Sequence, residues 1–151
     1  MIRTGVFVGS FNPFTTGHDS IVRRALLLFD RLVIGVVGDN VNKPSLTPAE
    51  QRMEAIRQLY AENPAVEVKT FYGLAMEFAR QEGAQFIVKG VRSAKDFEYE
   101  REQADLNRAI GGIETVLLYA EPQLSSVSST MVRELQHFGV DVSRFIPSKN
   151  G

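Results

Sequence analysis

The chain has 151 residues, with 17 Lys and Arg against 18 Asp and Glu, and its length predicts one domain over residues 1–151. It has no cysteine, which excludes disulfides, thiolate catalysis and Cys-ligated metals together. The balanced charge argues against broad nucleic-acid binding, whereas a small anionic ligand needs only two or three local cations.

The first apolar run, GVFV at 5–8, predicts a strand that starts close to the N-terminus. A strand this early leaves no room for a signal peptide. The longest apolar stretches, ALLLF and LVIGVV, are far too short to span a bilayer. We therefore expect a soluble, cytoplasmic protein with no membrane partner.

Strand-length apolar runs alternate with helical periodicities along the whole chain. Strands are expected at 5–8, 32–37, 66–71, 86–90 and 115–120, and helices at 17–30, 48–61, 74–82, 95–110 and 128–138. Such alternation is typical of βα crossovers and of a parallel sheet covered on both faces. The sequence therefore predicts a Rossmann-like α/β fold, a doubly wound five-stranded parallel sheet.

Local signals mark several helix ends. In SLTPAEQR, Thr47 is expected as the N-cap, Pro48 as the first helical residue and Glu50 as the capping-box residue. Gly83 stands where a C-terminal cap belongs, and the hydroxyl residues before Met131 predict another helix start.

In a doubly wound sheet, ligands bind at the carboxyl ends of the strands, so the loops after the strands carry the candidate site. The first loop holds Gly9, Ser10 and Asn12 and leads through Gly17 to His18 at a helix start. A helix start attracts anions and disfavours a protonated histidine, so His18 would donate a hydrogen bond to a phosphate. An ordinary turn with a surface histidine is an equally good interpretation of this loop alone.

Three further loops carry groups that suit phosphate. Lys43 follows the second strand, although a lone loop lysine is usually solvated. Lys89 and Arg92 flank a glycine after the fourth strand, and LSSVSST after the fifth places five hydroxyls near a helix start, where a redundant N-cap is the alternative. Together the four loops predict a nucleotide or polyphosphate site.

Other kinds of site lack their motifs. The dinucleotide fingerprint, the P-loop and the serine-hydrolase elbow are absent from the sequence. No cluster of His, Asp and Glu has metal-ligand spacing, so we predict no protein-built metal site. The carboxylates of DFEYEREQADLNR are expected on a solvated helix face, with Glu100 able to reach a ligand, and His137 is expected to be exposed at a helix end.

Three motifs resemble those of a known family. GSFNPFTTGH resembles the (T/S)-x-G-H loop of the nucleotidyltransferase superfamily, and VSSTMVR resembles its second signature. KGVRSAKDFEYE is similar to a stretch of the bacterial phosphopantetheine adenylyltransferases, and the order of motifs matches over essentially the whole chain. The resemblance implies the nucleotidyltransferase fold and transfer of AMP from ATP to 4′-phosphopantetheine, without a covalent intermediate.

The resemblance also implies the roles of individual residues. Catalysis would involve His18, Lys43, Ser10 and Arg92. The ATP site would comprise Ser10, Phe11, Gly17, His18, Gly90, Val91, Arg92, Glu100, Leu124, Ser125, Ser126, Val127, Ser128, Ser129 and Thr130. The acceptor site would comprise Ser10, Lys43, Leu74, Ala75, Lys89, Leu106 and Asn107.

The implied partners are ATP, brought in with Mg²⁺, and 4′-phosphopantetheine. The family also implies a homohexamer and feedback by coenzyme A. Three residues depart from the family pattern: Asn12 replaces Asp, Lys89 replaces Arg, and Ala75 replaces a larger side chain. The alternatives are an adenylyl- or cytidylyltransferase with another acceptor, chiefly nicotinate mononucleotide, and a non-catalytic nucleotide sensor.

Overall fold

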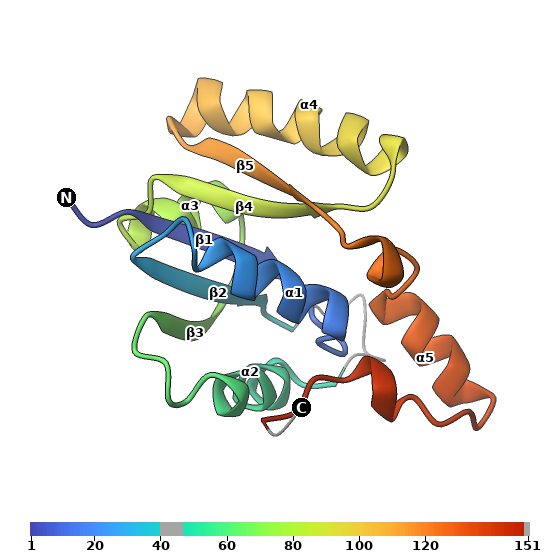
Figure 1. Ribbon diagram of the computed structural model, residues 1–151. Coiled ribbons are helices and arrows are strands. Elements are labelled where there is room, and N and C mark those ends of the chain that lie inside the picture. Colours follow the sequence, from blue (N-terminus) through green and yellow to red (C-terminus); the bar gives the residue numbers. More distant parts are fainter. Residues whose placement is uncertain (40–46, 150–151) are drawn as a thin grey trace.

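Five parallel strands form one sheet in the computed structural model, which describes residues 1–39 and 47–149 (Figure 1). The strands are β1 (Thr4–Gly9), β2 (Arg31–Val37), β3 (Val66–Phe71), β4 (Phe86–Val91) and β5 (Glu114–Tyr119). Their order is β3-β2-β1-β4-β5, and every neighbouring pair is parallel. The predicted α/β fold and all five strands are confirmed.

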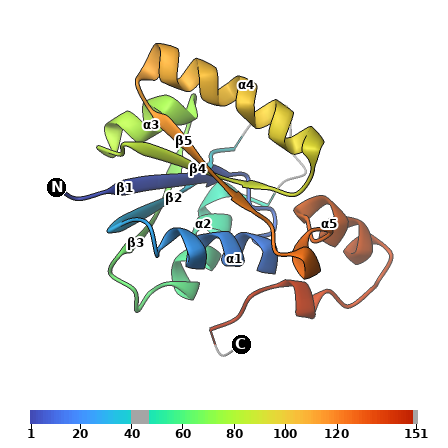
Figure 2. The ribbon, with the colours of Figure 1, turned by 45° about the horizontal axis from the view of Figure 1, so that its top comes forward.

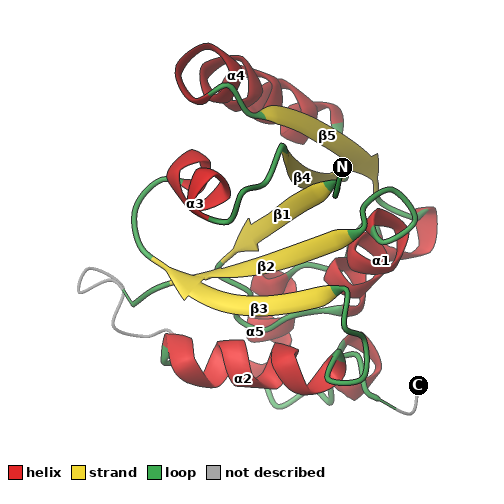
Figure 3. Cartoon of the chain, turned by 90° about the vertical axis from the view of Figure 1, so that its left-hand side faces the viewer, coloured by secondary structure: helices red, strands yellow, loops and turns green. Residues whose placement is uncertain are grey.

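Helices follow the strands and cover both faces of the sheet. They are α1 (Thr16–Ala25), α2 (Ala49–Leu59), α3 (Ala75–Gln81), α4 (Ala94–Gly111) and α5 (Ser129–His137), with the short 3₁₀ helices η1 (Pro122–Leu124) and η2 (Ser143–Phe145). Figure 3 shows α1 and α3 on opposite sides of the strands. Alternation along the strands creates the two faces, because neighbouring side chains point in opposite directions.

The core accordingly has two parts. On one face, Phe7 and Ile34 belong to the cluster that includes buried apolar residues of α1 together with Met53 and Ile56 of α2. On the other, Val6 and Val33 belong to the cluster that includes Phe78 of α3. The strands are therefore apolar on both faces, as expected of a covered parallel sheet.

The strand order reverses between β1 and β4. From β1 the chain proceeds through β2 to the edge strand β3, and then returns to β4 on the other side of β1. The loops after β1 and β4 therefore leave the sheet in opposite directions and open a crevice at its carboxyl edge, which is where such sheets bind ligands.

Two helix boundaries differ from the sequence prediction. Helix α1 ends at Ala25 and not near residue 30, because the chain from Leu26 to Phe29 forms turns that bond back to Val22, Arg24 and Ala25. These turns bring the Phe29 ring over Gly5, where it is buried.

The capping residues predicted for the start of α2 are wrong. Pro48 is the N-cap and not the first helical residue, and neither Thr47 nor Glu50 provides a side-chain cap. The Asp39 carboxylate, ten residues earlier, accepts from Ala49 N at 2.8 Å. Gly83 after α3 has the left-handed φ of +69° that was expected of a C-terminal cap.

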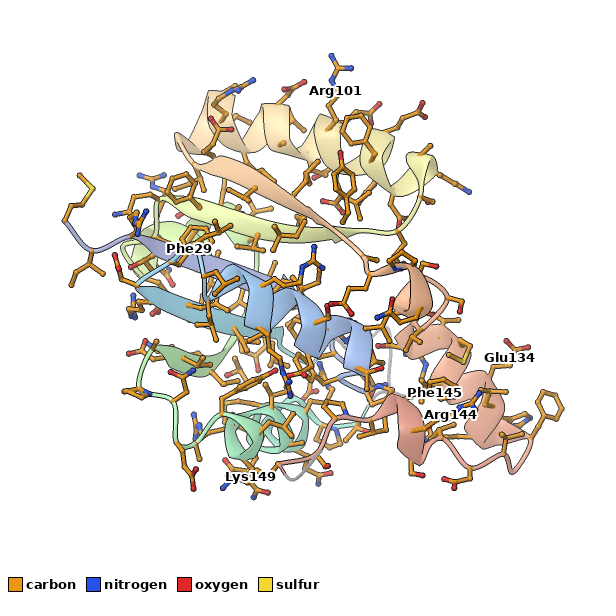
Figure 4. The ribbon with its side chains drawn as sticks, viewed as in Figure 1. Phe29, Arg101, Glu134, Arg144, Phe145 and Lys149 are labelled. Atoms are coloured by element: carbon orange, nitrogen blue, oxygen red, sulfur yellow. The ribbon has the colours of Figure 1, made fainter. Side chains whose placement is uncertain are left out.

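Helix α4 lies over the β4 and β5 side of the sheet and differs from the other α-helices of the described residues in its exposure. It has 18 residues, and none of them is buried. Figure 4 shows Arg101 pointing away from the body of the molecule. The expected solvated helix face is thus confirmed. No helix in the described part of the chain is long and apolar enough to cross a membrane.

Candidate active site

A cavity of about 350 Å³ opens at the crevice between β1 and β4. Figure 2 shows the segment that leads into α5 beside the N-terminal end of α1, so that two helix starts meet there. The cavity brings together twelve of the predicted site residues: Ser10, Phe11, Gly17, His18, Lys89, Gly90, Arg92, Leu124, Val127, Ser128, Ser129 and Thr130. Residues from three separate loops therefore line one cavity.

Other predicted site residues do not line this cavity. Val91 is buried in the sheet, Ser125 and Ser126 are exposed, and Glu100 lies on α4. Lys43 lies outside the described residues.

Four predicted acceptor residues lie on the α3 and α4 side of the sheet. Leu74 is the exposed N-cap of α3, and Ala75 contacts the second core cluster. Leu106 and Asn107 are on α4. The structure therefore separates the predicted acceptor-arm residues from the cavity itself.

Six cavity residues had no individual role in the sequence prediction, although Gly9 and Thr15 belong to the loop that it singled out: Phe7, Val8, Gly9, Thr15, Ile21 and Ala120. Helical spacing could have found Ile21, because it lies three residues after His18 and so on the same helix face. The sequence pattern of the other apolar residues is typical of a buried core, and only the geometry of the loops exposes them to a cavity.

His18 occupies a fixed position because it helps to start its own helix. Thr15 is the N-cap of α1, and His18 is the third helical residue. Thr15 N donates to His18 Nδ1 at 2.9 Å, and His18 N donates to Thr15 Oγ1. This is a capping box in which the imidazole takes the place of the usual Glu or Gln.

This capping box sets the tautomer of the imidazole. Because Nδ1 accepts from a backbone N–H, the proton of a neutral ring must be on Nε2. His18 therefore has one N–H donor that has no partner among the described residues and can bond with a group in the cavity.

Aromatic rings surround His18. Its ring stacks on Phe14, with centroids 5.3 Å apart, and meets the edge of Phe11 at 5.0 Å. Burial, together with the nearby charge of Arg92, lowers the pKa of His18 from 6.5 to about 4. The imidazole is consequently neutral at physiological pH and acts as a donor through Nε2 and not as a cation.

Phe11 reaches its position through an unusual backbone conformation. Its φ is +49°, which is uncommon for a bulky residue. The ring packs so closely on Gly9 that a Cβ there would lie 3.1 Å from it. Gly9 at the end of β1 therefore leaves room for the Phe11 ring, and a larger residue there would have to displace this ring, which contacts His18.

Helix α5 holds the same loop from the other side. Ser129 Oγ donates to Pro13 O at 2.6 Å, and Arg133 donates to the carbonyl of Asn12. The Ser128 side chain caps α5 by accepting from Met131 N. Several predicted phosphate-binding hydroxyls thus also have structural bonds, which was the alternative interpretation of that loop.

The cations of the site are balanced by carboxylates of α4. Lys89 Nζ lies 3.5 Å from Glu100 Oε2, and Arg92 Nε lies 3.5 Å from Asp96. Glu100 Oε2 is buried and has no hydrogen-bond partner among the described residues. A phosphate that entered between Lys89 and Arg92 would therefore compete with carboxylates already held close to them.

The arrangement suits the binding of a polyanion. Two helix N-termini provide unpaired N–H groups, His18 provides a neutral donor, and Lys89 and Arg92 provide charge. In residues 1–39 and 47–149 there is no group of three or more His, Asp and Glu that could hold a metal ion.

Comparison with known sequences gives consistent matches. A family model described as cytidylyltransferase-like matches residues 6–135. The chain is 51% identical over 146 residues to a phosphopantetheine adenylyltransferase of Phocaeicola vulgatus, which covers 97% of this chain and 96% of the relative. A phosphopantetheine adenylyltransferase of Leuconostoc citreum is 43% identical, over 94% of this chain and 90% of the relative.

Solved structures share the fold at low identity. A bifunctional NMN adenylyltransferase/ADP ribose pyrophosphatase from Francisella tularensis has a TM-score of 0.70 and 17% identity, covering 99% of this chain but only 46% of that one. The same protein complexed with AMP and a manganese ion has a TM-score of 0.71 and 16% identity, with 98% and 45% coverage. This chain thus spans less than half the length of these solved chains, and the likeness concerns the fold.

Proposed function

The chain belongs to the phosphopantetheine adenylyltransferase family of cytidylyltransferase-like proteins, and we propose that it transfers AMP from ATP to 4′-phosphopantetheine, giving dephospho-coenzyme A and pyrophosphate. The family resemblance that was inferred from the motifs is thereby confirmed. The observation that carries the mechanism is the fixed imidazole of His18, whose Nδ1 accepts from Thr15 N and whose Nε2–H is free to donate.

The reaction needs no general base. The nucleophile is a phosphate monoester, whose second pKa is about 6, so it is already largely a dianion at neutral pH. Direct attack on the α-phosphorus forms the new P–O bond as the bond to pyrophosphate breaks, with no covalent intermediate. The protein's contribution is to position two polyanions and to stabilise charge as it develops.

His18 stabilises the α-phosphate in the transition state. A neutral donor held by a helix cap and two aromatic contacts does not have to reorganise when charge develops, which is the condition for strong electrostatic catalysis. Ser10 lies in the same loop and is proposed to contact both the acceptor phosphate and ATP.

Cations on either side of the α-phosphate bind the remaining charge. Lys89 is proposed to bind the acceptor phosphate, together with Lys43, which lies outside the described residues. Arg92 is proposed to bind ATP phosphates, with the chain from Gly90. The start of α5 would hold the triphosphate through its N–H groups, and the loop 124–130 would frame the adenine.

The pantetheine arm is proposed to lie along the α3 and α4 side of the sheet. Lys89 belongs to this side, because it pairs with Glu100 of α4. Leu74 and Leu106 are both exposed there, at 60% and 51%, and can cover an apolar arm. Ala75 and Asn107 complete the proposed acceptor residues.

A divalent ion fits this site only as a companion of the nucleotide. The described residues hold no carboxylate cluster, and Mg²⁺ commonly binds through substrate phosphates and water. We infer that Mg²⁺ is the ion, and when bound it would neutralise charge on the phosphates of ATP. Ser10 and Ser128 are cavity residues whose hydroxyl oxygens could help to hold such an ion.

We further propose that residues 1–151 act as one nucleotidyltransferase domain, in the cytoplasm where ATP is available, and as a homo-oligomer. The oligomer, which the family suggests to be a hexamer, is supported by the exposed apolar side chains of α4, including Ile110 at 69% exposure. Coenzyme A, which contains the product's pantetheine arm, is proposed as a feedback ligand.

The proposal is tested by ATP-dependent pyrophosphate release with 4′-phosphopantetheine, with nicotinate mononucleotide and without acceptor, all in Mg²⁺. We expect release only with 4′-phosphopantetheine. Release only with nicotinate mononucleotide would overturn the acceptor assignment. ATP binding without release in any arm would indicate a nucleotide sensor.

A second assay tests the acceptor side. Replacing Lys43 by Ala should raise the KM for 4′-phosphopantetheine much more than the KM for ATP, since Lys43 is assigned to the acceptor phosphate. An equal loss for both substrates would move Lys43 to the nucleotide.

A further inference from the structure

Arg52 is the one charged side chain that is buried in the described part of the chain. It lies on α2 with only 4% of its surface exposed. Burying a cation is unfavourable unless its donors are satisfied. The partners that satisfy Arg52 show what it holds in place.

The guanidinium of Arg52 joins the loops that leave β1 and β2. Nη1 donates to Ser10 O at 2.7 Å and to Val37 O at 3.0 Å. Nε donates to Thr47 O at 2.6 Å, and Nη2 lies 3.2 Å from the Asp39 carboxylate. One planar group therefore connects the Ser10 carbonyl to Asp39 and Thr47, the described residues on either side of 40–46.

These bonds require the shape of an arginine. Acceptors on Ser10, Thr47 and Asp39 lie around different nitrogens, and a guanidinium presents five N–H donors in a rigid plane. A lysine ammonium is a single point and cannot reach all of them. The second bond of Asp39, to Ala49 N, fixes the carboxylate against the start of the same helix.

We propose that Arg52 is a positioning residue, which holds the loop of residues 10–14 in the conformation that binds the acceptor phosphate. The proposal rests on the proposed function, since Ser10 is assigned there to the acceptor. Arg52 acts through the Ser10 carbonyl and itself touches no substrate. Its effect should fall mainly on the acceptor, because ATP is proposed to have additional contacts to β4 and α5.

Arg57 provides a matched control on the same helix. It also donates to a strand carbonyl, Val68 O at 3.1 Å, but it reaches neither Ser10 nor Asp39. Loss of an arginine bond between α2 and the sheet would therefore appear in Arg57→Met, whereas loss of loop positioning would appear only in variants of Arg52.

The test compares wild type, Arg52→Met, Arg52→Lys and Arg57→Met in steady-state kinetics. We expect Arg52→Met to lower kcat/KM for 4′-phosphopantetheine by about 10- to 100-fold, the usual effect of a small misplacement. This loss should come chiefly from an increase in the KM for 4′-phosphopantetheine. The ATP affinity, measured by equilibrium binding, should stay within about threefold of wild type. Arg52→Lys should be intermediate, and Arg57→Met should resemble wild type.

A second readout does not depend on activity. Amide hydrogen exchange of residues 10–14 should be faster in both Arg52 variants and unchanged in Arg57→Met. If Arg52→Met does not fold, Arg52→Lys, which keeps the charge, decides the question by the same measurements.

The outcomes separate the two proposals. In the Arg52 variants, equal changes in the KM for ATP and for the acceptor would overturn the role of Arg52, and so would hydrogen exchange of residues 10–14 that matches the Arg57→Met control. The proposed function would still hold if the wild type transfers AMP to 4′-phosphopantetheine. A wild type that does not use 4′-phosphopantetheine would overturn the acceptor function, and faster loop exchange in the Arg52 variants would still show that Arg52 holds the loop.

Discussion

Helices α1 and α4 follow the neighbouring strands β1 and β4, and both carry proposed site residues. They differ in how far they are buried in the core. Helix α1 has ten residues, and Ile21, Val22 and Ala25 are buried in the core. Helix α4 has 18 residues and none is buried. His18 on α1 has a backbone bond and two aromatic contacts, whereas Glu100 on α4 has a carboxylate oxygen without a hydrogen-bond partner among the described residues.

The difference shows where this fold provides precision by itself. A donor that must meet developing charge has to be in place before the reaction, and the α1 side achieves this with contacts internal to the chain. In the proposed function, the α4 side would be completed by groups from outside the chain, namely the acceptor, the nucleotide or a second copy. We therefore expect changes at α1 to impair chemistry and folding, and changes at α4 to impair binding and assembly.

The largest expected effect comes from separating the two roles of His18. In His18→Asn, the short amide can accept from Thr15 N and keep the helix start, but no donor remains at the position of Nε2. Turnover should fall by about 10²- to 10³-fold, the usual effect of removing one such donor. Substrate affinities should change much less, and the thermal midpoint should stay near wild type.

Ala at position 18 removes both roles and provides the comparison. Its turnover should fall as far as that of His18→Asn, with an additional loss of stability of about 1 kcal/mol from the missing cap. Turnover within a few-fold of wild type in either variant would show that His18 is not the stabilising donor.

The next effect is on acid stability. The folded pKa of His18 is about 4, below the value of 6.5 in an unfolded chain. The unfolded state therefore binds more protons between these values, and stability falls as pH drops from 6.5 towards 4. The total loss should be about 3 kcal/mol.

Urea unfolding at several pH values measures this loss. His18→Asn should remove that part of the pH dependence, whereas the exposed His137→Asn serves as the control and should leave it. An unchanged slope in His18→Asn would show that the ring is not buried in its neutral form. In kinetics, loss of turnover near pH 6 should reflect protonation of the acceptor phosphate, so the residual activity of His18→Asn should show the same loss.

A smaller loss of stability is expected when a buried side chain of α1 is shortened. Val22 on α1 is fully buried, and Val22→Ala should destabilise the fold by about 2 kcal/mol, which chemical denaturation can measure. If the loss were no greater than for a surface residue, α1 would not be anchored as the structure indicates.

The smallest effect on stability is expected from a substitution on α4, which should instead change the assembly of the protein. Ile110 is 69% exposed, so Ile110→Ser should change the unfolding free energy of the isolated chain by less than about 0.5 kcal/mol. Light scattering should nevertheless show a lower molar mass than wild type. Equal masses would exclude this part of α4 from a subunit interface.

Much of the fold could be predicted because its signals are local. The strands were found within about one residue of their ends, since each is a short apolar run, and Gly83 marked the end of α3. The end of α1 was missed because ALLLF continues the helical pattern, and only the packing of Phe29 over Gly5 shows why the chain leaves the helix there.

The site could be located from the sequence but not completed. His18, Lys89 and Arg92 were predicted because they are residue types that suit phosphate in loops that follow strands, and the structure places all three in one cavity. Arg52 was not found, because nothing in the local sequence indicates that its partners lie on loops 5 to 42 residues away. Asp39 was missed for the same reason: it caps a helix that starts ten residues later.

The double use of His18 has a consequence for how substitutions at this position would be scored. A mutational scan that counts only folded protein should score side chains able to accept from Thr15 N near wild type and other side chains slightly lower, because the lost cap is worth about 1 kcal/mol. A scan that selects for coenzyme A supply should reject both groups. Comparing the two scans at position 18 would separate substitutions that impair folding from substitutions that impair only the reaction.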